Sequence, residues 1–234
     1  MGQARRVLTR LTAPAKLTLS LRVVGRRADG YHLIDAEMVT LDLGDELVVE
    51  PGSNDLPADD LVSRALAAVG RDARVTVRKR IPTGAGLGGG SADAAAILRW
   101  AGCADPAVAA ALGADVPFCL LGGRARVRGI GEVVDPRPFE ARTFTLLTPP
   151  FPVFTPAVYA AWDKMGGPVG PGGNDLEPAA LAVEPRLAEW RDHLTAATGR
   201  PARLAGSGGT WFVDGAHPAA SGAVVARTVP APGP

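Results

Sequence analysis

The sequence predicts an α+β protein in two parts, and three observations carry this prediction. Its opening segment alternates apolar and polar residues in the manner of β-strands. A glycine-rich segment then leads into an alanine-rich run that is typical of a helix. After residue 140 the pattern changes to short pieces separated by proline and glycine. We therefore expect one domain at residues 1–140 and a second at residues 141–234.

The first domain is expected to open as a β-meander. Residues 16–23 place four apolar side chains on one face and polar ones on the other, which predicts a half-buried strand. After it we expect a turn at 25–30, strand character up to residue 41, a turn at Gly44-Asp45 and a strand at 47–49. A loop at 51–59, a helix at 60–69 and a strand at 74–81 complete this part.

The remaining elements follow the same reasoning. Ser91 is expected to cap a helix that continues to Trp100, because serine is a favourable N-cap and alanine a strong helix former. In the second domain we expect a strand at 143–151, a helix at 154–162, a loop at 164–174 and a helix at 184–197. Residues 203–213 should form a strand, a glycine turn and a second strand.

Charge and cysteine content restrict the class of partner. The 25 basic and 24 acidic residues leave a net charge of +1, which argues against a general nucleic-acid binder. No apolar run is long enough to cross a membrane, and charged residues interrupt the N-terminal segment, so we expect neither a membrane partner nor a signal peptide. The two cysteines, Cys103 and Cys119, suit reduced thiols in the cytoplasm. Oligomeric state cannot be read from these features.

The glycine segment Pro82–Ser91 is the sharpest local feature. Between a strand and a helix, its uncovered backbone N–H groups and the helix N-terminus can bind a phosphate chain, although a mobile turn is the alternative. No lysine precedes Ser91, which excludes a Walker A loop. Gly84, Gly86 and Gly89 satisfy G-x-G-x-x-G, but no second strand follows, so a dinucleotide fold is not favoured.

Three further features permit a structural or a functional interpretation. Lys16 lies on the polar face of the first strand, where a solvated lysine is the common case. Asp115, in the segment GADVPF, could be a turn or cap residue or a partly buried functional carboxylate. Taken alone, the glycines of 206–209 indicate a hairpin turn.

In combination, these segments resemble the GHMP kinases. The segments that carry the resemblance are APAKLTLSLRVVGRRADGYH, IPTGAGLGGGSADAAA, LGADVPF, NDLEPA and LAGSGGTWF, in this order between about Ala13 and Val213. The resemblance implies a ribosomal protein S5 domain 2-like N-terminal domain and a ferredoxin-like C-terminal domain. GRRADGYH and GADVPF further indicate the members that phosphorylate the 2-hydroxyl of a cytidine-diphosphate-linked methylerythritol in isoprenoid precursor synthesis.

The resemblance also implies residue roles. Asp115 would be the general base and Lys16 would lie beside it and the transferred phosphoryl group. Tyr31 and His32 would hold the cytosine, Thr18 would contact the substrate, and Gly206, Ser207 and Gly208 would close the site. The ATP phosphates would be wrapped by Pro82, Thr83, Gly84, Ala85, Gly86, Leu87, Gly88, Gly89, Gly90, Ser91 and Ala92. Mg²⁺ is expected with ATP, with Ser91 the one candidate ligand and no evident carboxylate cluster.

Two departures from the family pattern leave alternatives open. Thr18 replaces the usual asparagine of the first strand, and Ala92 replaces a second serine after the glycines. A kinase for homoserine, mevalonate or a sugar is one alternative, although such substrates have no base for Tyr31 and His32 to hold. A non-catalytic nucleotide-binding homologue is the other, although the chain retains both Lys16 and Asp115.

Overall fold

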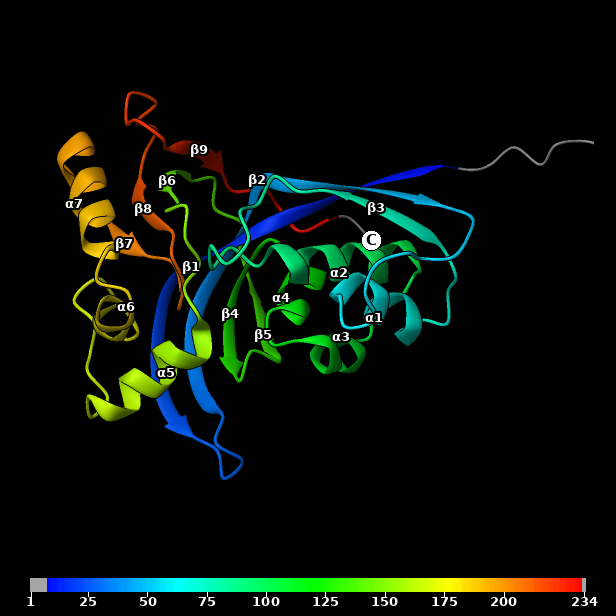
Figure 1. Ribbon diagram of the computed structural model, residues 1–234, viewed down its shortest axis with the longest axis horizontal. Helices are drawn as coiled ribbons and strands as arrows, with labels where there is room; N and C mark the ends of the chain where they lie inside the picture. Colours follow the sequence, from blue (N-terminus) through cyan, green and yellow to red (C-terminus); the bar gives the residue numbers. More distant parts are fainter. Residues whose placement is uncertain (1–7, 233–234) are drawn as a thin grey trace, which may run out of the picture.

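The computed structural model describes residues 8–232 and contains two antiparallel sheets (Figure 1). The N-terminal segment for which no signal peptide is expected therefore lies partly outside the described residues. The first sheet has the strand order β1-β2-β4-β5, with β3 also paired to β2. The second has the order β7-β8-β6-β9. This mixture of helices and antiparallel sheets confirms the α+β prediction.

A long hairpin forms the centre of the first sheet. It consists of β1 (Thr9–Arg26) and β2 (His32–Glu50), joined by the turn expected near residues 25–30. The expected turn at Gly44-Asp45 is wrong, because β2 continues through it opposite Ala13 and Pro14. A Cβ at Gly44 would lie 2.8 Å from the Ala13 carbonyl oxygen, so this glycine permits close approach of two strands instead of a turn.

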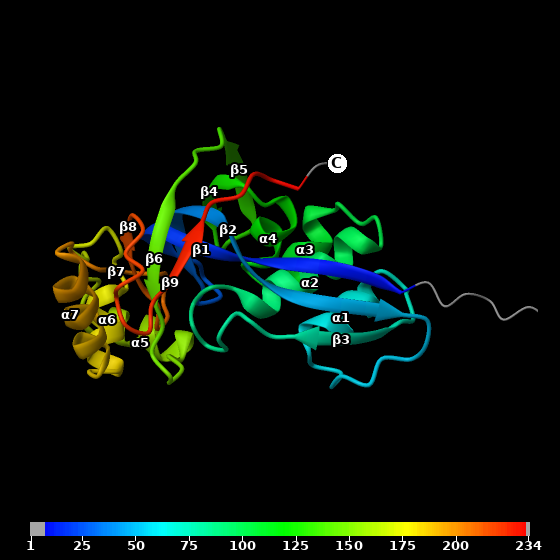
Figure 2. The ribbon, with the colours of Figure 1, turned by 90° about the horizontal axis from the view of Figure 1, so that it is seen from above.

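Helices cover one face of this hairpin (Figures 1 and 2). The alanine-rich helix α2 packs against β1 and β2, and its small side chains are buried. The other elements of this part are α1 (Leu61–Ala68), β3 (Arg74–Arg78), α2 (Gly89–Trp100), α3 (Pro106–Leu112), α4 (Val116–Leu121), β4 (Arg124–Gly129) and β5 (Val133–Arg137). None of the four elements between residues 106 and 137 is expected from the patterns above.

Two predicted boundaries are wrong for identifiable reasons. Strand β3 stops at Arg78 because the buried Asp45 carboxylate accepts the backbone N–H groups of Arg80 and Ile81, which turns them away from the sheet. Ser91 is not the N-cap of α2: the helix begins at Gly89, and Gly88 occupies the cap with a left-handed φ of 70°. Glycine adopts this conformation without strain, so the helix starts before the serine.

The second sheet carries its helices at the far end of the molecule from α1–α4 (Figure 1). Its elements are β6 (Thr143–Leu147), α5 (Thr155–Lys164), α6 (Glu177–Val183), α7 (Leu187–Thr198), β7 (Arg203–Leu204), β8 (Trp211–Asp214) and β9 (Val224–Arg227). The elements expected in this part of the chain are all present, although their ends are shifted. Helix α6 and strand β9 were not expected. The domain boundary near residue 140 stays a prediction. Within residues 8–232, every helix is too short or too polar to span a bilayer.

Candidate active site

Two cavities are candidates for a ligand-binding site. The first, here called the hairpin cavity, has a volume of about 570 Å³ and lies between the β1–β2 hairpin, α5 and the turn at 206–207. The second, here called the loop cavity, has a volume of about 590 Å³ and is lined by residues 82–91 together with α1 and β3 side chains. Both volumes are in the range of ligand-binding pockets.

Lys16 and Asp115 meet at the inner end of the hairpin cavity. Lys16 Nζ lies 3.4 Å from Asp115 Oδ2 and donates a hydrogen bond to Thr18 Oγ1 at 3.1 Å. The lysine is only 6% exposed, whereas the Asp115 side chain is 33% exposed and faces the cavity. Asp115 precedes α4 but makes no capping hydrogen bond there, so its carboxylate is available for another role. The buried ammonium can stabilise negative charge at this point of the cavity.

Lys16 also connects this site to the glycine segment. Its backbone N–H donates to the Leu87 carbonyl at 3.0 Å, and a Cβ at Gly88 would lie 2.8 Å from Lys16 Cγ. The aliphatic part of the lysine therefore rests against the loop backbone, where only glycine fits. The stem of Lys16 thus connects the hairpin cavity, where its ammonium lies, to the glycine segment that lines the loop cavity.

The glycine segment is a backbone surface facing the loop cavity. Gly84, Gly86 and Gly88 all have positive φ values, between 70° and 77°. Residues Pro82 to Ser91 line the cavity, as the phosphate interpretation requires. Ala92 does not: it is fully buried in the core, and its N–H closes the first turn of α2 by bonding the Gly88 carbonyl.

The turn at 206–209 supports this segment from the second half of the chain. A Cβ at Gly86 would lie 2.8 Å from the Ala205 carbonyl oxygen, and Thr210 N–H donates to the Ala85 carbonyl at 3.1 Å. Gly206 and Ser207 line the hairpin cavity, whereas Gly208 packs against Gly86 and does not.

Asn174 was not predicted as a site residue, although it opens the NDLEPA segment. Its Nδ2 donates to the carbonyls of Leu204 and Gly206, at 2.9 and 2.6 Å, and its Oδ1 accepts from Leu176 N–H. The side chain is only 3% exposed. Asn174 therefore holds the turn at 206–209 in place, and the buried amide explains why an asparagine stands here.

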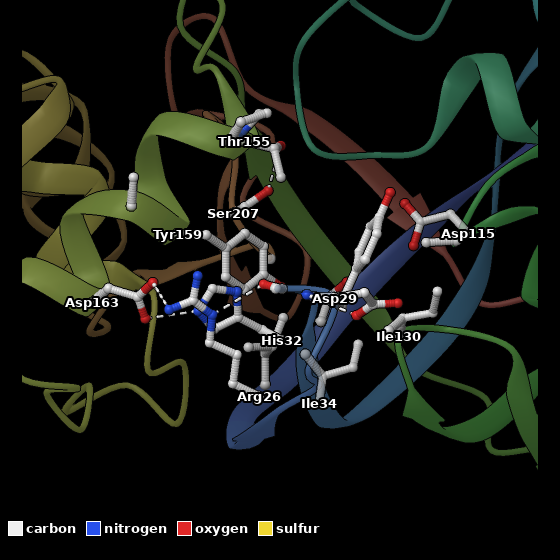
Figure 3. A pocket seen from close by; sticks show the side chains of 18 of the residues that line it. Arg26, Asp29, His32, Ile34, Asp115, Ile130, Thr155, Tyr159, Asp163 and Ser207 are labelled. Atoms are coloured by element: carbon white, nitrogen blue, oxygen red, sulfur yellow. Dashed lines mark hydrogen bonds and ion pairs between the residues drawn. The ribbon is translucent and has the colours of Figure 1, made fainter.

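Aromatic and charged groups form the outer end of the hairpin cavity (Figure 3). His32 Nε2 lies 2.8 Å from Asp163 Oδ1, and the imidazole stacks on Tyr159 with ring centroids 4.7 Å apart. Tyr31 also lines the cavity but is 61% exposed. Neither Tyr159 nor Asp163 is among the predicted site residues. Tyr159 lies in the expected helix at 154–162 and Asp163 directly follows it, so their i, i+4 spacing puts both side chains on one face of the helix. Burial, reinforced by the negative charge of Asp115, raises the pKa of Tyr159.

The loop cavity contains a charged cluster that the sequence did not reveal. Lys79 Nζ contacts the carboxylates of both Asp45 and Asp93, the latter at 2.8 Å. Burial raises the pKa of Asp93 to about 6, even though the Lys79 ammonium opposes this effect. Asp93 Oδ1 is buried and has no hydrogen-bond partner among the described residues. Within residues 8–232 there is no cluster of three or more histidine, cysteine or carboxylate side chains suited to a metal.

The arrangement suits transfer of a phosphoryl group from a nucleotide to a small alcohol. Backbone N–H groups at a helix start can bind phosphates in the loop cavity. Asp115 can accept a proton from a hydroxyl in the hairpin cavity, and Lys16 can stabilise negative charge beside it.

Comparison with known proteins agrees with this interpretation. A domain model described as "GHMP kinases N terminal domain" matches residues 60–123. The 4-diphosphocytidyl-2-C-methyl-D-erythritol kinase of Paracoccus denitrificans (strain Pd 1222) is 41% identical over 87% of this chain and 85% of its own length. A crystal structure of 4-(cytidine 5'-diphospho)-2C-methyl-D-erythritol kinase superimposes with a TM-score of 0.77 and 33% identity, covering 94% of this chain and 98% of that one.

A more distant structure shares the fold only. Homoserine kinase from Cytophaga hutchinsonii has a TM-score of 0.59 and 18% identity over 99% of this chain and 97% of its own. The same fold therefore occurs in a kinase that is named for a different substrate, so the fold alone does not identify the substrate.

Proposed function

We propose a function on the following premise: the chain belongs to the GHMP kinase family and, within it, to the 4-diphosphocytidyl-2-C-methyl-D-erythritol kinases. It phosphorylates the 2-hydroxyl of 4-diphosphocytidyl-2-C-methyl-D-erythritol in the non-mevalonate route to isoprenoid precursors. ATP is the phosphoryl donor, as membership of a kinase family implies. The observation that carries this proposal is the Lys16–Asp115 pair, 3.4 Å apart in the aromatic-lined hairpin cavity, with the stem of Lys16 packed against the glycine segment that lines the loop cavity.

The proposed reaction uses the pair directly. Asp115 takes the proton of the 2-hydroxyl as that oxygen attacks the terminal phosphorus of ATP. Lys16 stabilises the negative charge that spreads over the transferred group. The glycine segment and the α2 N-terminus hold the remaining phosphates. Thr18 already accepts a hydrogen bond from Lys16, so its hydroxyl positions the lysine as well as contacting substrate.

The outer end of the hairpin cavity suits the cytosine. Tyr31 is exposed enough to close over a base, while His32 offers a ring nitrogen to the base edge. Gly206 and Ser207 would close the middle of the cavity, and a hydrogen bond of 2.7 Å between Ser207 and Thr155 supports that position. Gly208 contributes indirectly, by supporting Gly86.

Residues that could hold Mg²⁺ are present in the loop cavity. Asp93 Oδ1 has no partner among the described residues, and Ser91 lines the same cavity. One carboxylate and one hydroxyl fit Mg²⁺, which is usually bound by few protein oxygens together with water and substrate phosphates. The ion would neutralise charge on the ATP phosphates.

The partner and compartment follow from the same proposal. The partner is the small cytidine-diphosphate sugar alcohol. The two cysteines, Cys103 and Cys119, are unpaired, which is compatible with the reducing cytoplasm where we propose that the enzyme acts.

A substrate panel tests the function. The purified protein, with ATP and Mg²⁺, should release ADP when 4-diphosphocytidyl-2-C-methyl-D-erythritol is added, and not with homoserine, mevalonate or galactose. The physical reason is that only the first substrate has a base for the aromatic end of the cavity. ADP release with one of the others would reassign the substrate, and ATP binding without turnover on any would indicate a non-catalytic homologue.

A further inference from the structure

We propose that Asp163 is a positioning residue that sets the preference for cytosine by holding His32 in a single tautomer. This inference rests on the proposed function, because the base belongs to the proposed substrate. It assigns a role to a carboxylate that lies at the opposite end of the hairpin cavity from Asp115 and so takes no part in the chemical step (Figure 3).

The Asp163 carboxylate connects α5 to both ends of the β1–β2 hairpin turn. Its Oδ1 lies 2.8 Å from His32 Nε2, and its Oδ2 lies 3.4 Å from Arg26 Nη1. The His32 side chain is only 9% exposed and that of Asp163 is 31% exposed. The hydrogen bond to His32 is therefore largely shielded from water, which strengthens it.

This contact determines where His32 carries its proton. An ionised carboxylate can only accept hydrogen bonds, so the imidazole must present a proton at Nε2. A neutral imidazole then has a lone pair at Nδ1. Among the described residues Nδ1 has no hydrogen-bond partner, and His32 lines the cavity. Nδ1 is thus an acceptor available to a bound ligand.

The same helix fixes the plane of the ring. Tyr159 stacks on the imidazole at an interplanar angle of 25°, and Trp162 meets it edge-on with ring centroids 5.7 Å apart. Both belong to α5 together with Asp163. One element therefore sets the orientation and the tautomer of His32, as partners of functional histidines commonly do.

An acceptor at Nδ1 distinguishes the two common pyrimidines. Cytosine has a 4-amino group, which donates a hydrogen bond, whereas uracil has an oxygen at this position, which accepts one. The Nε2–H tautomer therefore favours cytosine, and the opposite tautomer would favour uracil. A site whose acceptor pairs with a specific donor of the ligand rejects an analogue without that donor. The buried acceptor would then be left without a hydrogen bond.

The tautomer can be measured directly. Long-range ¹H–¹⁵N spectra of the whole protein contain few imidazole signals to assign, because the chain has only three histidines. His32→Gln identifies the signals of His32 by their loss. We expect the Nε2–H tautomer in the unmodified protein and a mixture of tautomers in Asp163→Asn, since an amide can donate as well as accept. A proton at Nδ1 in the unmodified protein, or no change in Asp163→Asn, would overturn the proposal.

Nucleotide binding tests the consequence without requiring turnover. Calorimetry should show tighter binding of cytidine 5'-diphosphate than of uridine 5'-diphosphate, with the ratio of dissociation constants reduced about tenfold in Asp163→Asn. Arg26→Gln removes the second ion pair of Asp163 but leaves the contact to His32, and should keep the ratio. An unchanged ratio in Asp163→Asn contradicts the proposal. Correct tautomer and base preference without phosphorylation would instead contradict the proposed function alone.

Discussion

In the ion pair between Lys16 and Asp115, the lysine is buried and the aspartate is partly exposed. Lys16 is 6% exposed and held by Thr18 and by the Leu87 carbonyl, so the lysine is fixed before any ligand arrives. Asp115 is 33% exposed and free of capping contacts, so it can reach a substrate hydroxyl. This division suits a fixed electrostatic group next to a proton acceptor.

Asp115→Asn tests the proton acceptor. An amide has the same shape but cannot take the proton, so turnover should fall by about two to four orders of magnitude. ATP affinity should change little, because the loop cavity is not lined by Asp115. Steady-state ADP release and a nucleotide titration measure the two quantities, with the exposed Asp192→Asn as a matched control. Near-normal turnover would remove Asp115 from this role.

The candidate site residues could be identified from the sequence when they stood in a local pattern. Lys16, Asp115 and the glycines lie in short segments that the family resemblance covers. Asp163 and Asp93 were not predictable, because their roles depend on partners elsewhere in the fold. His32 and Asp163 are 131 positions apart, and only the packing of α5 on the hairpin brings them together. A lone aspartate in a helix carries no such information.

Glycines account for one correct and two incorrect predictions among the secondary structure elements. The glycines at 84–88 lie in a loop before a helix, as predicted, but the helix already includes Gly89 and Gly90, and Gly44 wrongly predicted a turn. A glycine can permit a positive φ, or it can permit close approach of another strand, and the sequence does not distinguish these uses. The short strands β4 and β5 and the short helices α3 and α4 are stabilised by packing more than by local preference.

Gly88→Ala tests the connection between the loop and Lys16. An alanine there would be strained by the φ of 70° and would also press on Lys16 Cγ. Gly102→Ala is a matched control, because its φ is 74° and nothing lies within 4 Å of the added methyl group. Both variants should lose about 1 kcal/mol of unfolding free energy from strain. Only Gly88→Ala should also lose turnover; equal activity in the two would contradict this connection.

At the scale of the whole molecule, the two parts of the chain share the hairpin cavity, whereas all the residues that line the loop cavity belong to the first part. Isolated bridges between Leu21 and Asn174, and between Leu41 and Thr228, join residues of the first part to residues of the second. The hairpin cavity takes its walls from both parts. The two-sheet plan and the family were predictable from the sequence, whereas these connections depend on contacts between distant segments.

Global stability should depend on pH through Asp93. Burial raises the pKa of Asp93 to about 6 in the folded protein, against an ordinary value of 3.8. The folded state therefore keeps a proton that the unfolded chain releases, so stability from this group is lost as pH rises from about 4 to about 6. As the pH rises through this range, the unfolding free energy of the unmodified protein should fall by about 3 kcal/mol relative to that of Asp93→Asn.

Denaturant unfolding at several pH values between 4 and 8 measures this difference. Lys79 and Asp45 face Asp93 in both proteins, so their effects largely cancel in the comparison. Asp192→Asn, an exposed carboxylate on α7, provides the control. A difference that stays constant across this range, or that grows in the opposite direction, would contradict the raised pKa.

The support of the glycine loop has a consequence for how the protein is made. A Cβ at Gly84 would collide with Pro152, and one at Gly86 would collide with Ala205 and Gly208. The ribosome releases the loop well before it releases those residues, and domains generally fold in the order of synthesis. The nascent chain can thus contain the complete nucleotide motif while still lacking the surface that holds it in shape. We therefore expect the glycine loop to take its final shape only after the chain up to residue 210 has emerged.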